Sequence, residues 1–89
     1  MTKAKLTLFV AGSSSRTTQA IENLRLLCEG CEGEIEFEIV DILDHPHMAE
    51  RERVFATPML VKSEPLPRRR IIGDLADRSL IKQRLDLSI

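Results

Sequence analysis

Aromatic residues and an excess of charge of one sign are both missing from this chain. It has no tryptophan or tyrosine and only three phenylalanines among its 89 residues. Single-stranded nucleic acids stack on exposed aromatic rings, and few such rings are available here. The 13 Lys and Arg residues are balanced by 14 Asp and Glu residues, so a formal net charge of −1 creates no field that attracts a polyanion. We therefore expect no nucleic-acid partner.

Long apolar runs are absent too, and cysteines are few. The apolar stretch over residues 6–11 contains Thr7 and is far shorter than the roughly 18 residues that suggest a membrane span. Its length and flanks do not fit a signal peptide either. Two cysteines are too few for a secreted fold held together by disulfides. We expect a cytoplasmic protein that does not enter a membrane.

The residues that are present suit a small folded domain. The chain is 43% hydrophobic and 30% charged, a composition that argues against intrinsic disorder. A chain of this size buries roughly 60–70% of the surface that its unfolded form exposes, which is enough for one modest core. We therefore expect residues 1–89 to form a single domain.

The first half of the chain alternates strand and helix signals. Residues 6–11 form an apolar, partly β-branched run that ends at Gly12 and predicts a buried strand. Any serine of residues 13–15 can cap the helix that the apolar spacing predicts over residues 17–28. Residues 34–43 begin with strict alternation of Glu and apolar residues, which predicts a strand with one acidic face.

The second half predicts a helix, a hairpin and a final helix. The elements are a helix capped by Asp44 and running to Val54, a strand at 59–62, a turn at 65–67, a strand at 70–72 closed by Gly73, and a helix capped by Asp74. The resulting order βαβαββα is that of the α/β thioredoxin-like fold. Because this fold commonly holds a cis proline before its third strand, we expect a cis bond between Thr57 and Pro58.

The end of the chain has two interpretations. Residues 85–89 alternate with period two, which is typical of a strand, whereas the apolar residues before them are spaced for a helix. Such a local conflict is one that sequences with a single fold usually avoid.

Cys28 and Cys31 form a C-x-x-C motif, which suggests a thiol–disulfide oxidoreductase as an alternative function. A reactive thiolate is favoured at a helix N-terminus, however, and this pair falls at the predicted C-terminal end of the first helix. One core cysteine and one loop cysteine is the favoured interpretation. A zinc site would need two more ligands, and nothing places His45 and His47, the only histidines, near the pair.

Charged clusters offer surfaces rather than catalytic groups. The acidic face of residues 34–38 is either the solvent side of an edge strand or a surface for a basic partner. The arginines of residues 68–70 are either a solvated hairpin edge or a site for the carboxylates of a partner. No phosphate-binding loop is present in the sequence, and we expect no enzyme activity, cofactor or metal.

Three segments carry a more specific resemblance. They are LFVAG at residues 8–12, ATPML at residues 56–60 and PLPRRRIIGDL at residues 65–75. Together with LDL at residues 85–87, they resemble the KaiB family of circadian-clock proteins over essentially the whole chain.

The resemblance implies a non-enzymatic protein that binds the ATPase ring of the RecA-like clock kinase KaiC and modulates its phosphorylation or output. It also implies a KaiA-like protein or a sensor kinase as a further partner. Two folds are implied as well. One is thioredoxin-like and binds KaiC, and in the other the C-terminal half is rearranged and the chain assembles as a homo-oligomer, a dimer or tetramer.

The resemblance also suggests which residues act. Partner binding is expected at Met48, Glu50, Arg51, Arg53, Arg69 and Arg70. Choice of fold is expected to depend on Thr57, Pro58, Gly73, Asp74, Arg84 and Asp86. Arg84 stands where clock members commonly have glycine, and arginine is the better helix former, so we expect it to favour the helical, thioredoxin-like form. Glu38 stands where those members tend to carry Lys, a reversal that changes partner choice more than fold.

Overall fold

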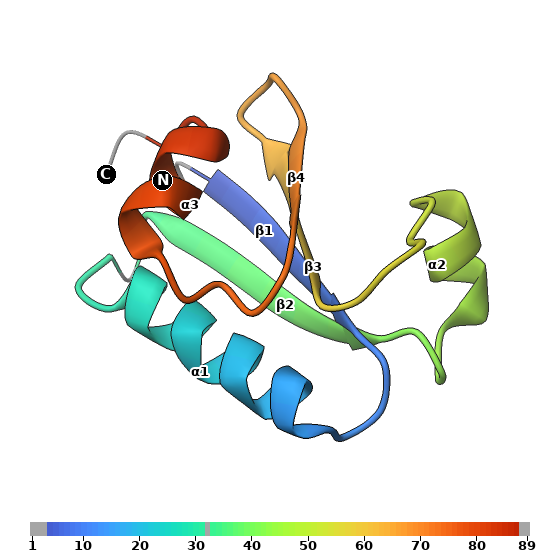
Figure 1. Ribbon diagram of the computed structural model, residues 1–89. Coiled ribbons are helices and arrows are strands. Elements are labelled where there is room, and N and C mark those ends of the chain that lie inside the picture. Colours follow the sequence, from blue (N-terminus) through green and yellow to red (C-terminus); the bar gives the residue numbers. More distant parts are fainter. Residues whose placement is uncertain (1–3, 32, 88–89) are drawn as a thin grey trace.

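The computed structural model describes residues 4–31 and 33–87. Along the chain it contains β1 (Ala4–Val10), α1 (Ser15–Cys28), β2 (Ile35–Asp41), α2 (Pro46–Arg51), β3 (Met59–Glu64), β4 (Arg69–Ile72) and α3 (Arg78–Arg84) (Figure 1). The predicted order βαβαββα and the α/β fold class are confirmed.

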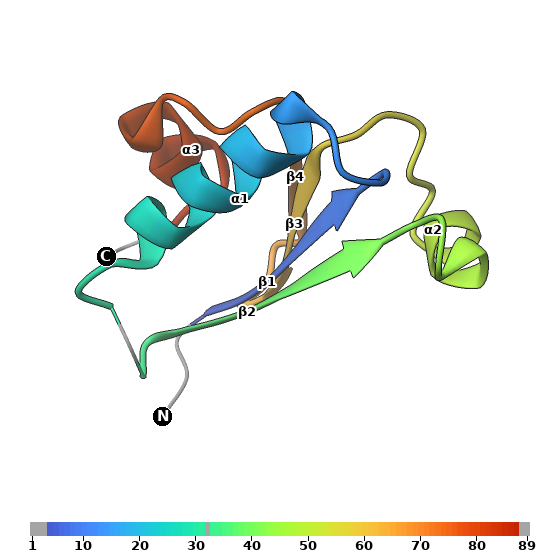
Figure 2. The same cartoon turned by 90° about the horizontal axis from the view of Figure 1, so that it is seen from below.

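The four strands form one sheet in the order β2-β1-β3-β4. β1 pairs in parallel with β2 and antiparallel with β3, and β3 pairs antiparallel with β4. The acidic strand β2 is therefore an edge strand, as predicted. α1 and α3 cover one face of the sheet, whereas α2 lies apart from both, beyond the carboxyl ends of β1 and β2 (Figures 1 and 2).

Strand alternation sends successive side chains to opposite faces of the sheet, and an apolar cluster forms on each face. The larger cluster lies between the sheet and the two covering helices; among its members are Leu6, Leu8, Leu60, Ala20, Leu24, Leu27, Ile81 and Leu85. The smaller cluster consists of Phe9, Val40, Met59 and Val61. Because α2 and the segment after it pack against this smaller cluster, the second cluster decides where α2 sits.

Thr17, Asn23 and Lys62 are buried polar residues, and the last two bear on the packing of the helices and the sheet. Asn23 of α1 donates a hydrogen bond from Nδ2 to the backbone oxygen of Asp74, 2.7 Å away, and so ties α1 to the segment between β4 and α3. Lys62 of β3 is 0% exposed, and its Nζ has no hydrogen-bond partner in the described part of the chain. Nothing in the sequence pattern marked either residue.

The helix N-termini agree with the sequence at α1 only. Ser14 caps α1 by accepting a hydrogen bond from the backbone N–H of Thr17, as the serine run predicted. The predicted caps Asp44 and Asp74 were wrong. α2 starts after His45, which makes no side-chain cap, and α3 starts after Asp77, which accepts from the N–H of Leu80.

The late start of α3 has a backbone cause. Leu75, predicted to begin the helix, has a φ of 65°, a left-handed conformation that no α-helix contains. Asp74 instead forms a local turn in which its Oδ1 accepts from the N–H of Ala76 at 3.1 Å. The side chain of Asp74 thus forms a cap-like hydrogen bond, but three residues before Asp77, the residue that caps α3.

α2 and α3 end in the same way. At the end of α2, the N–H of Val54 donates to the backbone oxygen of Ala49. The N–H of Arg53, a residue whose φ is 55°, donates to the backbone oxygen of Glu50. This pair of bonds is the Schellman motif, which stops a helix at a left-handed residue. The motif explains why α2 ends at Arg51, whereas the sequence predicted a helix that runs to Val54.

The same motif resolves the ambiguous end of the chain. The N–H of Leu87 donates to the backbone oxygen of Lys82. The N–H of Asp86, a residue whose φ is 56°, donates to the backbone oxygen of Gln83. The polar residue of the apparent strand alternation, Asp86, therefore occupies the left-handed position at which α3 stops. The last two residues of the predicted strand, 88 and 89, lie outside the described residues.

The bond between Thr57 and Pro58 is cis, as predicted. The backbone oxygen of Pro58 accepts a hydrogen bond from the N–H of Gly73 at 2.9 Å, where Gly73 has a φ of 135°. This bond joins the start of β3 to the end of β4, so three of the residues expected to influence the fold lie next to one another.

Candidate partner-binding surface

Asp41, the last residue of β2, fixes the chain where it turns toward α2. Its Oδ1 accepts hydrogen bonds from the backbone N–H groups of Gly12, at 3.1 Å, and Leu43, at 3.0 Å. Gly12 has a φ of 66°, which glycine adopts without a steric penalty. One carboxylate therefore holds the ends of β1 and β2 together at the base of α2.

The inner side of α2 is apolar. Met48 and Val54 are half-buried and pack against the cluster around Phe9. Met48 was predicted to contact a partner, and the structure places its side chain against the sheet. It therefore attaches α2 to the fold.

Two arginines of the β3–β4 hairpin hold the segment after α2 from the other side. Arg68 forms an ion pair with the carboxylate of Glu52. Arg70 donates from Nη1 to the backbone oxygens of Glu52, at 3.1 Å, and Arg53, at 3.3 Å. These contacts occupy helix-end carbonyls with a cation, the charge that the C-terminal end of a helix favours. The hairpin and the end of α2 are thereby joined although 16 to 18 residues separate the partners in sequence.

Arg69 does not join its neighbours at this surface. In the register of β3 and β4, Arg70 lies opposite Val61 and Arg69 lies opposite Lys62. Adjacent residues of a strand point to opposite faces, so Arg69 points to the face that α1 and α3 cover. Arg69 and Arg70 were both predicted to bind a partner, and the register places their side chains on opposite faces of the sheet.

Four exposed side chains on α2 and just after it form what we call the α2 surface: Glu50, Arg51, Arg53 and Phe55. Glu50, Arg51 and Arg53 were expected from the resemblance, and Glu50 and Arg53 line one depression with Phe55. Phe55 was missed, although it is 88% exposed. An open depression of about 350 Å³ is lined by Ala49, Glu50, Arg53, Val54 and Phe55.

The scarcity of aromatics was the signal that could have identified Phe55. Only three phenylalanines occur in the chain, and this one follows a predicted charged helix and breaks its amphipathic pattern. Phe55 differs from a lone exposed apolar residue because it lines a depression together with Val54 and the charged Glu50 and Arg53.

The remaining candidates lie elsewhere. Cys28 is the last residue of α1 and is buried, and Cys31 is half-buried in the loop beyond it, as predicted. Glu36 and Glu38 are exposed on the edge strand β2. Within residues 4–31 and 33–87, no group of three or more His, Cys, Asp and Glu side chains could hold a metal ion. In the same residues, no helix combines the length and apolar character needed to cross a membrane.

Sequence comparison identifies the relatives of the chain. A family model described as the KaiB domain matches residues 7–87. The circadian clock oscillator protein KaiB of Synechococcus elongatus is 41% identical over 83 residues, which are 92% of this chain and 81% of that protein. The circadian clock protein KaiB3 of Synechocystis sp. is 38% identical over 88 residues, which are 98% of this chain and 86% of that protein.

Structure comparison confirms the thioredoxin-like fold. The thioredoxin Deadhead of Drosophila melanogaster aligns with a TM-score of 0.78 over 98% of this chain and 82% of its own, at 15% identity. The N-terminal domain of SasA from Synechococcus elongatus aligns with a TM-score of 0.66 over 93% of this chain and 80% of its own, at 27% identity. The curated relatives are named as clock proteins and not as enzymes, in agreement with the non-enzymatic prediction. On the match over residues 7–87 and the identity to these relatives, the chain belongs to the KaiB family.

Proposed function

We propose that this member of the KaiB family is a regulatory protein of a circadian or clock-like timing system, and that it binds a KaiC-like RecA-type ATPase through the α2 surface. The clock-protein names of its relatives support the general role. The observation that carries the choice of surface is Phe55, which is 88% exposed on a segment that the rest of the fold holds in place.

The composition of the α2 surface suits a protein partner. Aromatic and arginine side chains supply a large share of binding energy at interfaces, and both types are present in Phe55, Arg51 and Arg53. Glu50 adds the opposite charge, so a partner with a complementary pattern is oriented as it approaches.

The attachment of α2 lowers the cost of binding. Met48 packs against the smaller apolar cluster of the sheet, and Arg70 donates hydrogen bonds to the carbonyls at the end of the helix. A surface that is already ordered loses less conformational freedom when a partner docks. The short helix therefore does not need to form on binding.

The likeness to the SasA N-terminal domain supports a shared docking site. That domain has the same fold at 27% identity, and related chains of one shape suit one surface of a common partner. We include competition with such a sensor-kinase domain in the proposal. The exposed acidic residues Glu36 and Glu38 on the edge strand form a separate face whose charge suits a basic partner.

The test measures binding of the chain to purified KaiC homologues of the same organism, with and without ATP. We expect Phe55→Ala to weaken binding by about tenfold or more, because it removes the one large apolar anchor. Arg51→Ala should slow association, and the effect should shrink as salt is raised, because the charge acts during encounter.

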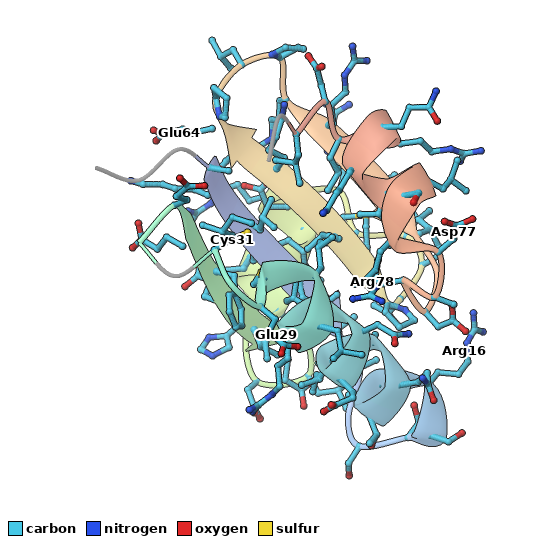
Figure 3. All side chains as sticks on the ribbon, turned by 90° about the vertical axis from the view of Figure 1, so that its left-hand side faces the viewer. Arg16, Glu29, Cys31, Glu64, Asp77 and Arg78 are labelled. Atoms are coloured by element: carbon cyan, nitrogen blue, oxygen red, sulfur yellow. The ribbon has the colours of Figure 1, made fainter. Side chains whose placement is uncertain are left out.

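Arg78→Ala serves as the matched control. Arg78 is an exposed arginine at the start of α3, on the part of the molecule away from α2 (Figures 1 and 3). Equal losses for Arg78→Ala and Arg51→Ala would show that the overall charge matters and the α2 surface does not. If the wild-type chain bound none of the KaiC homologues in either nucleotide condition, the proposed function would be wrong.

A further inference from the structure

The C-x-x-C motif is the one chemical feature that partner binding leaves unused. Cys28 is 7% exposed and belongs to the larger apolar cluster, and Cys31 is half-buried and packs against that same cluster. Figure 3 shows Glu29 and Cys31 where the chain leaves the end of α1. Both sulfur-bearing residues thus border one region of the core from positions three residues apart.

The backbone between the two cysteines forms a defined turn. The N–H of Cys31 donates to the oxygen of Cys28 at 3.0 Å. Glu29 has φ −62° and ψ 130°, and Gly30 has a φ of 81°. These dihedral angles are those of a type II β-turn, in which glycine supplies the left-handed third residue.

Such a turn has the reach of a disulfide. The first and fourth Cα atoms of a β-turn lie within about 7 Å of each other, and disulfides join Cα atoms about 4.4–6.8 Å apart. We propose that Cys28 and Cys31 are a reversible redox modification site, at which a low-molecular-weight disulfide such as oxidised glutathione converts the two thiols into one intramolecular disulfide. This proposal is independent of the proposed partner.

The reaction balances in two exchange steps. The thiolate of the more accessible Cys31 attacks one sulfur of the small disulfide, which forms a mixed disulfide and releases one thiolate. The thiolate of Cys28 then attacks Sγ of Cys31, closes the ring and releases the second thiolate. Two electrons pass from the protein to the reagent, and the two protons of the cysteines end on its two thiol products.

The position of the pair favours regulation over catalysis. A catalytic pair would sit at a helix N-terminus, where the dipole stabilises the attacking thiolate, and this pair sits at the opposite end of α1. Closure instead fixes the connection between α1 and the edge strand, because the oxygen of Cys31 accepts from the N–H groups of Glu34 and Ile35 at the start of β2. The modification therefore changes how rigidly β2 is held.

The experiment equilibrates the full chain with oxidised and reduced glutathione, then quenches it with acid, alkylates it and measures the intact mass. We expect a monomer lighter by two hydrogen atoms that takes up no alkylating reagent and is restored by a reductant. Cys28→Ser should accumulate a glutathione adduct on Cys31. Cys31→Ser should react at least about tenfold more slowly, because its remaining thiol is buried.

Gly30→Val tests the role of the turn. A Cβ at Gly30 would meet no atom within 4 Å, so the substitution acts through the left-handed backbone alone. We expect the closed ring to hold this turn more tightly than the reduced chain does, so the equilibrium constant for closure should fall by about tenfold. A stable glutathione adduct or a cross-linked dimer as the wild-type product would overturn the proposal. Unchanged closure in Gly30→Val would overturn it as well.

Discussion

Removal of the amino group of Lys62 should stabilise the protein. Lys62 follows Leu60 by two residues in β3, so it points to the face that α1 and α3 cover, and it is 0% exposed. Its Nζ has no hydrogen-bond partner among the described residues. Lys62→Met keeps an unbranched side chain of similar length and removes the polar group that the core does not satisfy.

The expected gain is the difference between two costs. A buried polar group without a hydrogen bond costs about 1–3 kcal/mol in protein mutational data, and more where the group is charged. Replacement by a side chain of similar volume costs less than about 1.5 kcal/mol in repacking. Lys62→Met should therefore raise the free energy of unfolding by about 1 kcal/mol, the difference between the middles of these two ranges. In a domain of this size, each 1 kcal/mol raises Tm by about 4–8 °C.

Urea unfolding of both chains, followed by far-UV circular dichroism, measures the change. Lys5→Met is the matched control, because Lys5 lies on the neighbouring strand with its side chain 49% exposed in an ion pair to Glu64. That pair is a surface pair and contributes about 0–1 kcal/mol, so the control should be neutral or slightly destabilised. If Lys62→Met lowered the midpoint, the amino group would be making an interaction that stabilises the fold, and the reasoning would be refuted.

Three further predictions concern the helix ends and the hairpin. Asp86→Gly should raise the free energy of unfolding by about 0.5 kcal/mol, because glycine suits the left-handed helix stop. Gln83→Gly inside α3 should lower it by about 0.8–1 kcal/mol. The same urea titration gives both values, and changes of the same sign would contradict the Schellman assignment. Arg84→Gly should weaken α3 by a similar amount and shift the chain toward a larger assembly in size-exclusion chromatography; an unchanged elution volume and spectrum would show that Arg84 does not bias the fold. Arg70→Met should lower stability by about 1 kcal/mol and also weaken binding to the ATPase, while Arg69→Met should stay within about 0.5 kcal/mol. Equal effects of these last two would contradict the separation of the two arginines.

The parts of the fold that could be predicted are those that local periodicity determines. β1, α1 and β2 follow from apolar runs, helical spacing and alternation, each of which reports the neighbours of a residue along the chain. The serine cap of α1 is equally local. Glu50, Arg51 and Arg53 came from the family resemblance, and all three are exposed on α2 or just after it.

The parts that could not be predicted depend on distant contacts or on backbone conformation. The hydrogen bonds of Arg70 to the end of α2 join segments that are far apart in sequence, so no local pattern reports them. The left-handed Leu75 and Asp86 are non-glycine residues in a conformation that propensity disfavours, and the surrounding structure selects it. The alternation around Asp86 is an instructive case, because a helix stop and a strand produce the same pattern of apolar and polar residues.

The contacts of Arg68 and Arg70 connect the candidate binding surface to the half of the chain whose sequence is ambiguous. The segment that carries Arg53 and Phe55 is held by the hairpin, and β4 is in turn held by the bond from Gly73 to Pro58. If β4 were to leave its place beside β3, Arg70 would no longer reach the carbonyls at the end of α2. The α2 surface would then lose one of its two attachments and keep only the apolar contacts of Met48 and Val54. If a partner binds the ordered α2 surface as proposed, its binding stabilises this arrangement of residues 65–87 relative to any arrangement that lacks the contacts of Arg70.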